Sequence, residues 1–237
     1  LFYDLTLFDK KQSLLFYNQE MNDYIANYLV IKKFENNKKR NFETFYFQSL
    51  KTPIGQELMI FPNYSEKTIS NMFANNTILS NRLGILNLYN RNKRSTRIDH
   101  TAELRYVKIN KNGFIYENIG KISNHFYDIQ QDKNKSSNYL ETTPLLSTII
   151  SYPLIKLNKN KNKDLLIPKI QLNYSPYNKF VTQFNLDSLE IGLNRTSLFS
   201  TNRFSGRDIQ EKGLWLNTGI KYERETITGK NFGTELG

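Results

Sequence analysis

The chain has 237 residues, of which 14% are aromatic, and its formal net charge is +11. Its mean hydropathy is −0.59, and no apolar run approaches the roughly 18 residues of a membrane-spanning helix, which excludes a helical membrane protein. A polar chain with 15 Tyr and 16 Phe but a single Trp favours strands over helices.

The basic charge has two interpretations. One is an anionic partner, either nucleic acid or an anionic, phosphorylated lipid. The other is Lys and Asn spread over solvated turns, as at residues 36–41 and 159–163, which we favour because the Lys clusters fall between the expected strands. The chain has no Cys and only His100 and His125, so we expect no disulfide, no zinc site and no cofactor.

The first 90 residues predict short aromatic strands separated by turns. In chain order these are Phe2–Phe8, Ser13–Glu20, Asp23–Phe34, Phe42–Leu50 and Gln56–Phe61. For Asp23–Phe34 a short helix fits equally well. Residues 36–41 form a charged turn, Thr52–Gly55 breaks the pattern, and Pro62-Asn63 ends the last strand. Residues 65–82 predict either a short helix within a loop or disorder.

The clearest strand of the first half is Asp99–Ile109. Leu104 and Tyr106 lie on one face, and Glu103 and Arg105 on the other. Such alternation over about ten residues is the length that a tilted membrane strand needs. Asn112-Gly113 predicts a tight turn, since Asn and Gly tolerate positive φ, and Phe114–Ile119 is the expected hairpin partner.

Residues 128–138 predict a polar loop, and the hairpins resume after it. The expected strands are Pro144–Ile155 and Leu165–Ser175, with a Lys/Asn loop at 156–164 and an ordered loop at Asp187–Gly206. Leu214–Glu223 and Thr226–Phe232 then close the chain with one more hairpin around Thr228-Gly229. Pro168 inside a strand argues for a bulge or an edge. Roughly ten to twelve strands and no crossover helix predict an all-β, antiparallel up-and-down meander, as in a sandwich or barrel.

Three segments of the last hundred residues resemble one family. The first is Pro144–Leu154, which closes on an aromatic residue, a proline and an apolar residue; the second is Leu166–Leu172, with Gln following a proline by three positions. The third is a motif made of Leu198, Phe199, Asn202, Arg203, Phe204, Ser205, Gly206 and Asp208. In this order the segments resemble the LptD family, whose members translocate lipopolysaccharide at the outer membrane.

The resemblance implies a section of a transmembrane outer-membrane β-barrel of roughly 26 strands, in a Gram-negative bacterium. It implies transport of lipopolysaccharide into the outer leaflet rather than catalysis. The implied partners are lipopolysaccharide, outer-membrane lipids, a lipoprotein plug of LptE type and periplasmic bridge proteins, with no nucleic acid. We expect residues 1–237 to be a central fragment of the barrel domain, without its periplasmic domain and closing strands, that does not fold alone because both edges are unpaired.

Two rival functions stay open at this point. Another outer-membrane barrel, a porin or a plugged transporter, would show the same alternation but not the three ordered segments. A soluble, basic β-sheet protein that binds nucleic acid would gather Lys, Arg and aromatic residues on one strand face. The three ordered segments count against the first rival, and the mixed charge of the strand faces counts against the second. Both rank below lipopolysaccharide transport.

Two sets of candidate site residues follow from the resemblance and the alternation. In the 198–208 motif, Arg203 or Arg207 could bind a lipid phosphate; the favoured alternative is a structural loop, in which Asp208 accepts backbone N–H groups, Gly206 supplies positive φ, and Phe199 and Phe204 pack on neighbouring strands. The expected lumen-facing residues are Glu103, Arg105, Lys169, Gln171 and Lys221. Trp215 lies on the polar side of its strand, where it either packs on something inside the lumen or shows that the faces are inverted.

Overall fold

The computed structural model describes residues 2–8, 24–49, 58–71, 76–90, 93–132, 135–158, 162–177, 185–192, 197–226 and 231–236. These residues form twelve β-strands, which are β1 (Phe2–Phe8), β2 (Tyr24–Glu35), β3 (Lys38–Ser49), β4 (Leu58–Asn71), β5 (Thr77–Asn90), β6 (Lys93–Ile109), β7 (Ile115–Asp132), β8 (Lys135–Ser151), β9 (Leu154–Leu157), β10 (Lys163–Ser175), β11 (Gly213–Glu225) and β12 (Asn231–Leu236). No helix in this described part of the chain is long and apolar enough to cross a membrane.

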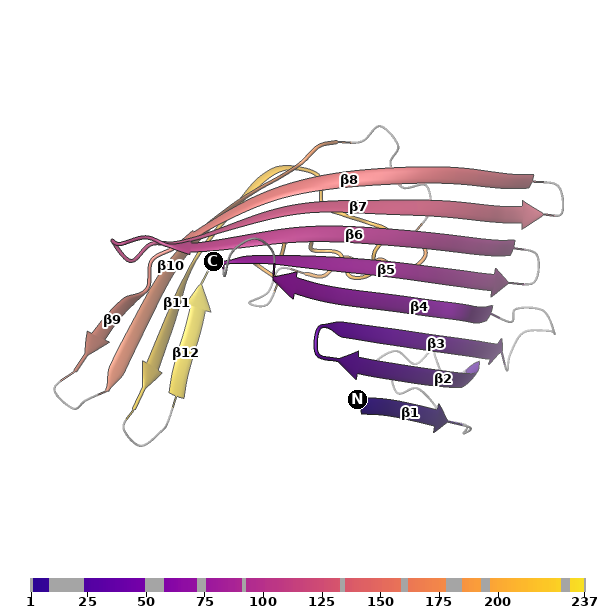
Figure 1. The fold of residues 1–237 in the computed structure, drawn as a ribbon, viewed down its shortest axis with the longest axis horizontal. Coiled ribbons are helices and arrows are strands. Elements are labelled where there is room, and N and C mark those ends of the chain that lie inside the picture. The colour runs from indigo at the N-terminus through magenta and orange to yellow at the C-terminus, as the bar shows by residue number, and fades with distance from the viewer. Residues whose placement is uncertain are drawn as a thin grey trace. The chain divides into compact units, whose positions relative to one another are not determined.

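Except for β9, each strand lies beside one that comes just before it in the chain (Figure 1). The order runs from β1 to β8 and on through β10, β11 and β12, and β9 pairs with β10 as a continuation of β8. The β1–β2, β2–β3, β10–β11 and β11–β12 pairs are antiparallel. The expected all-β, antiparallel up-and-down meander is therefore confirmed.

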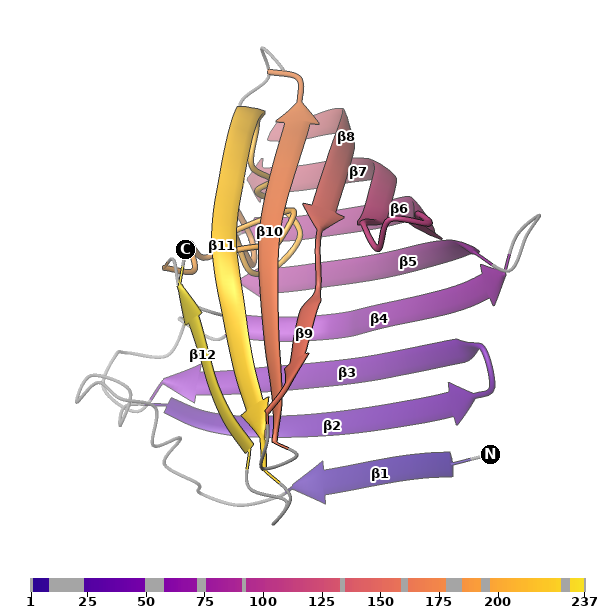
Figure 2. The same ribbon diagram turned by 90° about the vertical axis from the view of Figure 1, so that its left-hand side faces the viewer.

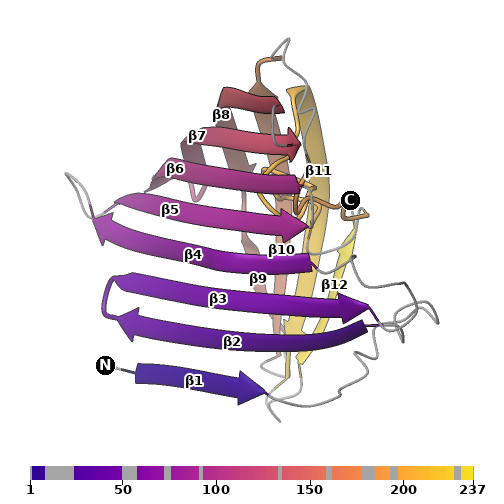
Figure 3. The same ribbon diagram turned by 90° about the vertical axis from the view of Figure 1, so that its right-hand side faces the viewer.

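The chain divides into two compact units. The first contains residues 1–70, 80–102 and 123–142, and the second contains residues 71–79, 103–122 and 143–237. Strands β2 to β4 follow one another in the first unit (Figure 3), and β9 to β12 do so in the second (Figure 2). Strands β4 to β8 contribute residues to both.

The structure corrects several predictions for the first half. Of the two alternatives for Asp23–Phe34, the strand is confirmed over Tyr24–Glu35, and only Asn36-Asn37 form the turn that we expected over 36–41. Strand β4 continues through Pro62-Asn63, where a turn was predicted, because the β3–β4 register shifts opposite this point, between Glu43 and Phe45. Such a bulge accommodates a proline inside a sheet. The helix or disorder predicted over 65–82 is wrong where the chain is described, because these residues belong to β4 and β5.

The hairpin between β6 and β7 is confirmed. Asn110 N donates to Phe114 O (2.8 Å), Gly113 N donates to Asn110 O (2.9 Å), and Gly113 has a φ of 87°. Both strands exceed their predicted lengths, and the loop predicted over 128–138 is wrong because β7 continues to Asp132 and β8 begins at Lys135. The predictions at Ser13–Glu20, Thr52–Gly55 and Thr228-Gly229 lie outside the described residues.

Pro168 causes neither a bulge nor an edge, contrary to the prediction. Strand β10 pairs on one side with β8 and β9 and on the other with β11, and the β10–β11 register is unbroken from Lys163 to Ser175. Tyr152 N donates to Pro168 O (3.2 Å), whereas proline has no N–H to donate in return. The break between β8 and β9 therefore lies opposite the proline.

The two faces of the strands differ in chemistry within each unit. In the second unit the odd-numbered Ser147, Gln171 and Asn173 are fully covered, whereas the even-numbered Leu172 and Leu216 are 48% and 61% exposed. In the first unit the odd-numbered side chains Arg97, Asp99, Ser123 and His125 are buried, and their even-numbered neighbours Ile98 and Phe126 are exposed. We call these the polar face and the apolar face. The polar face also includes buried apolar residues such as Leu145 and Ile149, but covered polar groups opposite exposed apolar ones reverse the arrangement of a water-soluble sheet.

Candidate functional site

An ordered loop connects β10 to β11, and we use this name for its described residues 185–192 and 197–212. Its two arms are joined by backbone hydrogen bonds. Ile191 N donates to Arg203 O (2.7 Å) and Ser205 N to Leu189 O (2.8 Å), on either side of a bridge between Glu190 and Phe204. The loop is therefore a folded element with its own backbone pairing.

The carboxylate of Asp208 closes the base of this element. Its Oδ2 accepts the N–H groups of Leu186 (2.6 Å) and Asp187 (2.9 Å), and the side chain is 2% exposed. In return, Ser188 Oγ accepts the N–H of Asp208 (2.9 Å), and Asp187 Oδ1 accepts the N–H of Arg207 (2.8 Å). A hydrogen bond from a backbone N–H to an ionised carboxylate is stronger than one between two neutral groups. The carboxylates of Asp208 and Asp187 therefore stabilise the base of the loop.

Gly206 allows the two arms to come this close. Its φ is +73°, and a Cβ at this position would lie 2.3 Å from the backbone oxygen of Asp187. Only glycine adopts that conformation without strain and leaves room for the carbonyl. The hydrogen bonds of Asp208 and the φ of Gly206 are those expected for a structural loop.

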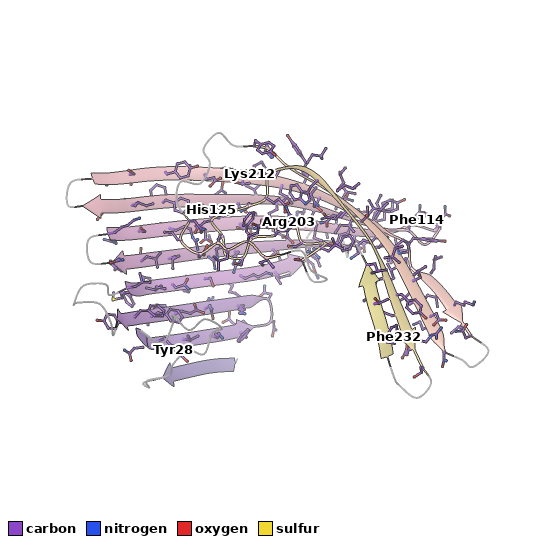
Figure 4. All side chains as sticks on the ribbon, turned by 180° about the vertical axis from the view of Figure 1, so that it is seen from behind. Tyr28, Phe114, His125, Arg203, Lys212 and Phe232 are labelled. Carbon is purple, nitrogen blue, oxygen red and sulfur yellow. The ribbon has the colours of Figure 1, made fainter. Side chains whose placement is uncertain are left out.

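Asn202 and Arg203 hold the other end of the loop. Asn202 Nδ2 donates to the backbone oxygens of Phe204 (3.2 Å) and Ile209 (3.0 Å), and its Oδ1 accepts the N–H of Glu211 (3.0 Å). Arg203 donates through Nε to Glu211 Oε2 (2.9 Å) and through a second nitrogen to the other carboxylate oxygen. These hydrogen bonds to Glu211 raise the pKa of Arg203. Arg203, which lies in the loop (Figure 4), is therefore already engaged with a carboxylate.

Phe199 connects the loop to the polar face of β10 and β11. Its ring lies 4.5 Å from the Lys169 ammonium, measured to the ring centroid. A Cβ on Gly219 would approach the same ring to 3.0 Å and Leu236 O to 2.8 Å. Lys169 and Gly219 are direct partners across the two strands. The glycine thus provides the space in which Phe199 packs, and the lysine supplies a cation–π contact.

Beside this contact, the polar face carries a ladder of amide and hydroxyl groups. Asn217 Nδ2 donates to Gln171 Oε1 (3.2 Å), and Gln171 Nε2 donates to Ser147 Oγ (3.1 Å). On the next rung, Asn173 pairs with Trp215, and neither the Asn173 amide nor Trp215 Nε1 has a hydrogen-bond partner among the described residues. Leu214 and Leu216 are exposed on the opposite face, so the faces of β11 are not inverted at Trp215.

The other residues expected on this face are paired within the strands. Arg105 contacts Glu117 across the hairpin (3.0 Å) and Glu103 along its own strand (3.4 Å). Lys221 contacts Glu223 (2.6 Å). The structure therefore brings Lys169 to the ordered loop and Gln171 into the ladder beside it, whereas Arg105 and Lys221 have carboxylate partners on the strands themselves.

Sequence reasoning missed several buried ionisable side chains in the first unit. Arg97 and Asp99 form an ion pair on β6 (3.3 Å) with both side chains covered, and His125 and Glu141 are buried on β7 and β8. In the sequence these side chains are marked only by polar residues at every second position, as in Arg97-x-Asp99 and Ser123-x-His125. That pattern does not by itself indicate a covered face. Within the described ranges, no group of three or more His, Asp or Glu side chains could hold a metal ion.

Two comparisons with known proteins bear on this arrangement. The model of one protein family, described as LptD, LPS transport system D, matches residues 4–235. No curated protein matches the chain. The family match covers all twelve strands in part or whole, together with the ordered loop.

Proposed function

The chain belongs to the LptD family of the lipopolysaccharide transport system, and from that premise we propose that its strands form part of the wall of a barrel in the Gram-negative outer membrane. The family's function, lipopolysaccharide transport and assembly at the outer membrane, is that of this protein. The proposal adds a location, a direction and a division of roles. The apolar face contacts lipid, the polar face lines the interior, and lipopolysaccharide is delivered to the outer leaflet.

The reversal of the two strand faces is the observation that supports this proposal best. On neighbouring strands β10 and β11, exposed Leu172, Leu214 and Leu216 alternate with Gln171, Asn173 and Asn217 on the polar face. In water such a sheet would expose its apolar residues and cover its polar ones, at a cost for both. In a bilayer, the same alternation is the one that transmembrane barrels require.

We assign the ordered loop a structural role inside the barrel. Asp208 and Asn202 use their polar side chains to accept or donate hydrogen bonds within the loop, and Arg203 is held by Glu211. Phe199 then anchors the loop to the wall through Lys169 and Gly219. This arrangement supports the structural interpretation of the 198–208 motif over phosphate binding by Arg203.

The proposed partners are lipopolysaccharide itself, the lipids of the outer membrane, a lipoprotein plug of LptE type inside the barrel and the periplasmic bridge proteins of the transport system. A positively charged interior would favour an anionic glycolipid. Among the expected lumen-facing residues, Lys169 is the candidate for such attraction, since Arg105 and Lys221 already contact carboxylates.

The test is depletion of the full-length protein in its own cell, with lipopolysaccharide assayed at the cell surface. We expect surface lipopolysaccharide to be lost while other outer-membrane barrels still assemble. Unchanged surface lipopolysaccharide, combined with lost uptake of a solute, would instead make the protein a porin or transporter. Re-expression of the unmodified protein is the matched control, since it must restore the surface lipopolysaccharide.

A further inference from the structure

Strand β9 is an edge within the sheet rather than at its ends. It pairs with β10 from Leu154 to Leu157, and it has no second partner among the described strands. The neighbouring β6–β7 turn ends beside Tyr152, whose ring stacks on Phe114 (4.6 Å between centroids) and lies 3.3 Å from the Cβ position of Gly113. Strand β9 therefore extends past this turn with one side unpaired, as Figures 1 and 2 show.

The backbone groups on the unpaired side can be identified from the hydrogen bonds on the paired side. Tyr152 N donates to Pro168 O (3.2 Å) and Asn158 N to Asn162 O (2.9 Å). In a strand, the N–H and C=O of successive residues point to opposite sides. The groups of Ile155 and Leu157 therefore point away from β10, and Pro153 offers a carbonyl but no N–H.

The side chains of the same two residues are apolar and exposed. Ile155 and Leu157 are 61% and 74% exposed, although they are odd-numbered and continue the polar face of β8. Contact with lipid on the apolar face does not cover them. Unpaired backbone groups are costly in hydrocarbon, and an apolar edge in water readily pairs with another strand. An added strand would cover both the backbone groups and the side chains.

Charge indicates the chemistry of that strand. Lys156 lies on the apolar face opposite Asp164, but Asp164 accepts hydrogen bonds from Arg224 (2.6 Å), Asn158 (2.6 Å) and Tyr222 (3.0 Å). Lys156 forms no ion pair among the described residues, so an acidic residue beside it would find an available cation.

We propose that β9 is a docking edge for an extended segment of a partner protein, which adds to the sheet as a strand beside Ile155 and Leu157. The segment carries apolar residues on the side of these two and an acidic residue on the side of Lys156. This is β-strand addition, in which backbone hydrogen bonds supply affinity and alternate side chains supply specificity. The inference rests on the unpaired edge and holds whether or not the apolar face contacts lipid.

Amide hydrogen exchange on the full-length protein tests the pairing directly. In its native membrane we expect the amides of Ile155 and Leu157 to be protected, and in the protein purified away from its partners we expect these two to exchange fast while Leu154 and Lys156, bonded to β10, stay slow. Fast exchange of Ile155 and Leu157 in the native membrane would overturn the proposal.

A pair of substitutions and a photo-crosslinker identify what occupies the edge. Leu157→Pro removes the exposed N–H, and an edge strand tolerates it, whereas Leu157→Val keeps the N–H. With benzoylphenylalanine at Ile155, we expect a crosslink to an extended, acidic and apolar segment of another protein, reduced at least tenfold by Leu157→Pro and unchanged by Leu157→Val. Crosslinks only to lipid or to a second copy of the chain, or equal yields for both substitutions, would refute the proposal. Surface lipopolysaccharide is assayed separately, so a failure here is distinguishable from a failure of the transport function.

Discussion

Gly206→Ala provides the sharpest test of how the ordered loop is held. The methyl group would lie 2.3 Å from the backbone oxygen of Asp187, and the residue would keep a φ of +73°. Gly192→Ala is the matched control, because Gly192 belongs to the same loop and a Cβ there meets nothing within 4 Å. The two substitutions add the same methyl group to the same loop.

The expected cost of Gly206→Ala has two parts. A left-handed conformation costs an L-residue about 1–2 kcal/mol. The methyl group also forces Asp187 away, which weakens its bonds with Arg207 N (2.8 Å) and Asp208 Oδ2 (2.9 Å). One such charge-assisted bond contributes about 1.5–3 kcal/mol. Together these terms predict that the free energy needed to open the loop is lower by about 2.5–5 kcal/mol than in the unmodified protein.

Limited trypsin digestion of the full-length protein measures this change, because Arg207 becomes cleavable only when the loop opens. When opening is fast compared with cleavage, the rate follows the open population. At a factor of ten for about every 1.4 kcal/mol, cleavage of Gly206→Ala should be faster by roughly 50-fold or more. A rate within twofold of that of Gly192→Ala would refute the assigned role of Gly206.

Three further predictions concern the loop and the two faces. Asp208→Ala leaves two backbone N–H groups without their acceptor, so loop cleavage should accelerate by at least about tenfold; an unchanged rate would contradict it. Gly219→Ala places a Cβ 3.0 Å from Phe199 and 2.8 Å from Leu236 O, and should displace the ring and raise cleavage at the loop; an unchanged cleavage rate would contradict the role assigned to Phe199. Leu216→Arg should destabilise the membrane-embedded protein by about 2–4 kcal/mol if Leu216 lies near the bilayer midplane, whereas Asn217→Arg on the polar face should cost less; equal losses in a urea titration would count against the face assignment.

The hairpins with apolar alternation were predictable, and the polar strands were not. Leu104 and Tyr106 against Glu103 and Arg105, followed by Asn112-Gly113, carry a signal in the local sequence alone. Residues 128–138 carry no such signal, because one face of a strand in this sheet is polar and hydropathy alone does not distinguish it from a loop. The strand that passes through Pro62 was not predictable for the same reason. The bulge there is visible only in the register between β3 and β4.

The ordered loop was predictable as a unit but not in its connections. The motif around Gly206 and Asp208 indicated a turn with positive φ and a carboxylate that accepts backbone N–H groups. The acceptors and donors of the opposite arm, Asp187 and Ser188, lie about twenty residues earlier, and no short-range pattern links them. The contact of Phe199 with Gly219 likewise depends on the β10–β11 register, which a single sequence does not define.

In the proposed barrel wall, even-numbered residues of β11 contact lipid and odd-numbered ones do not, and quenching of tryptophan fluorescence by brominated lipids tests this assignment most directly. Trp215 is the only Trp of this chain, and Trp215→Phe isolates its signal in the full-length protein. We predict that Trp215 is not quenched and that Trp215→Phe combined with Leu216→Trp gives a strongly quenched emission. Quenching of Trp215, or none from position 216, would contradict the account.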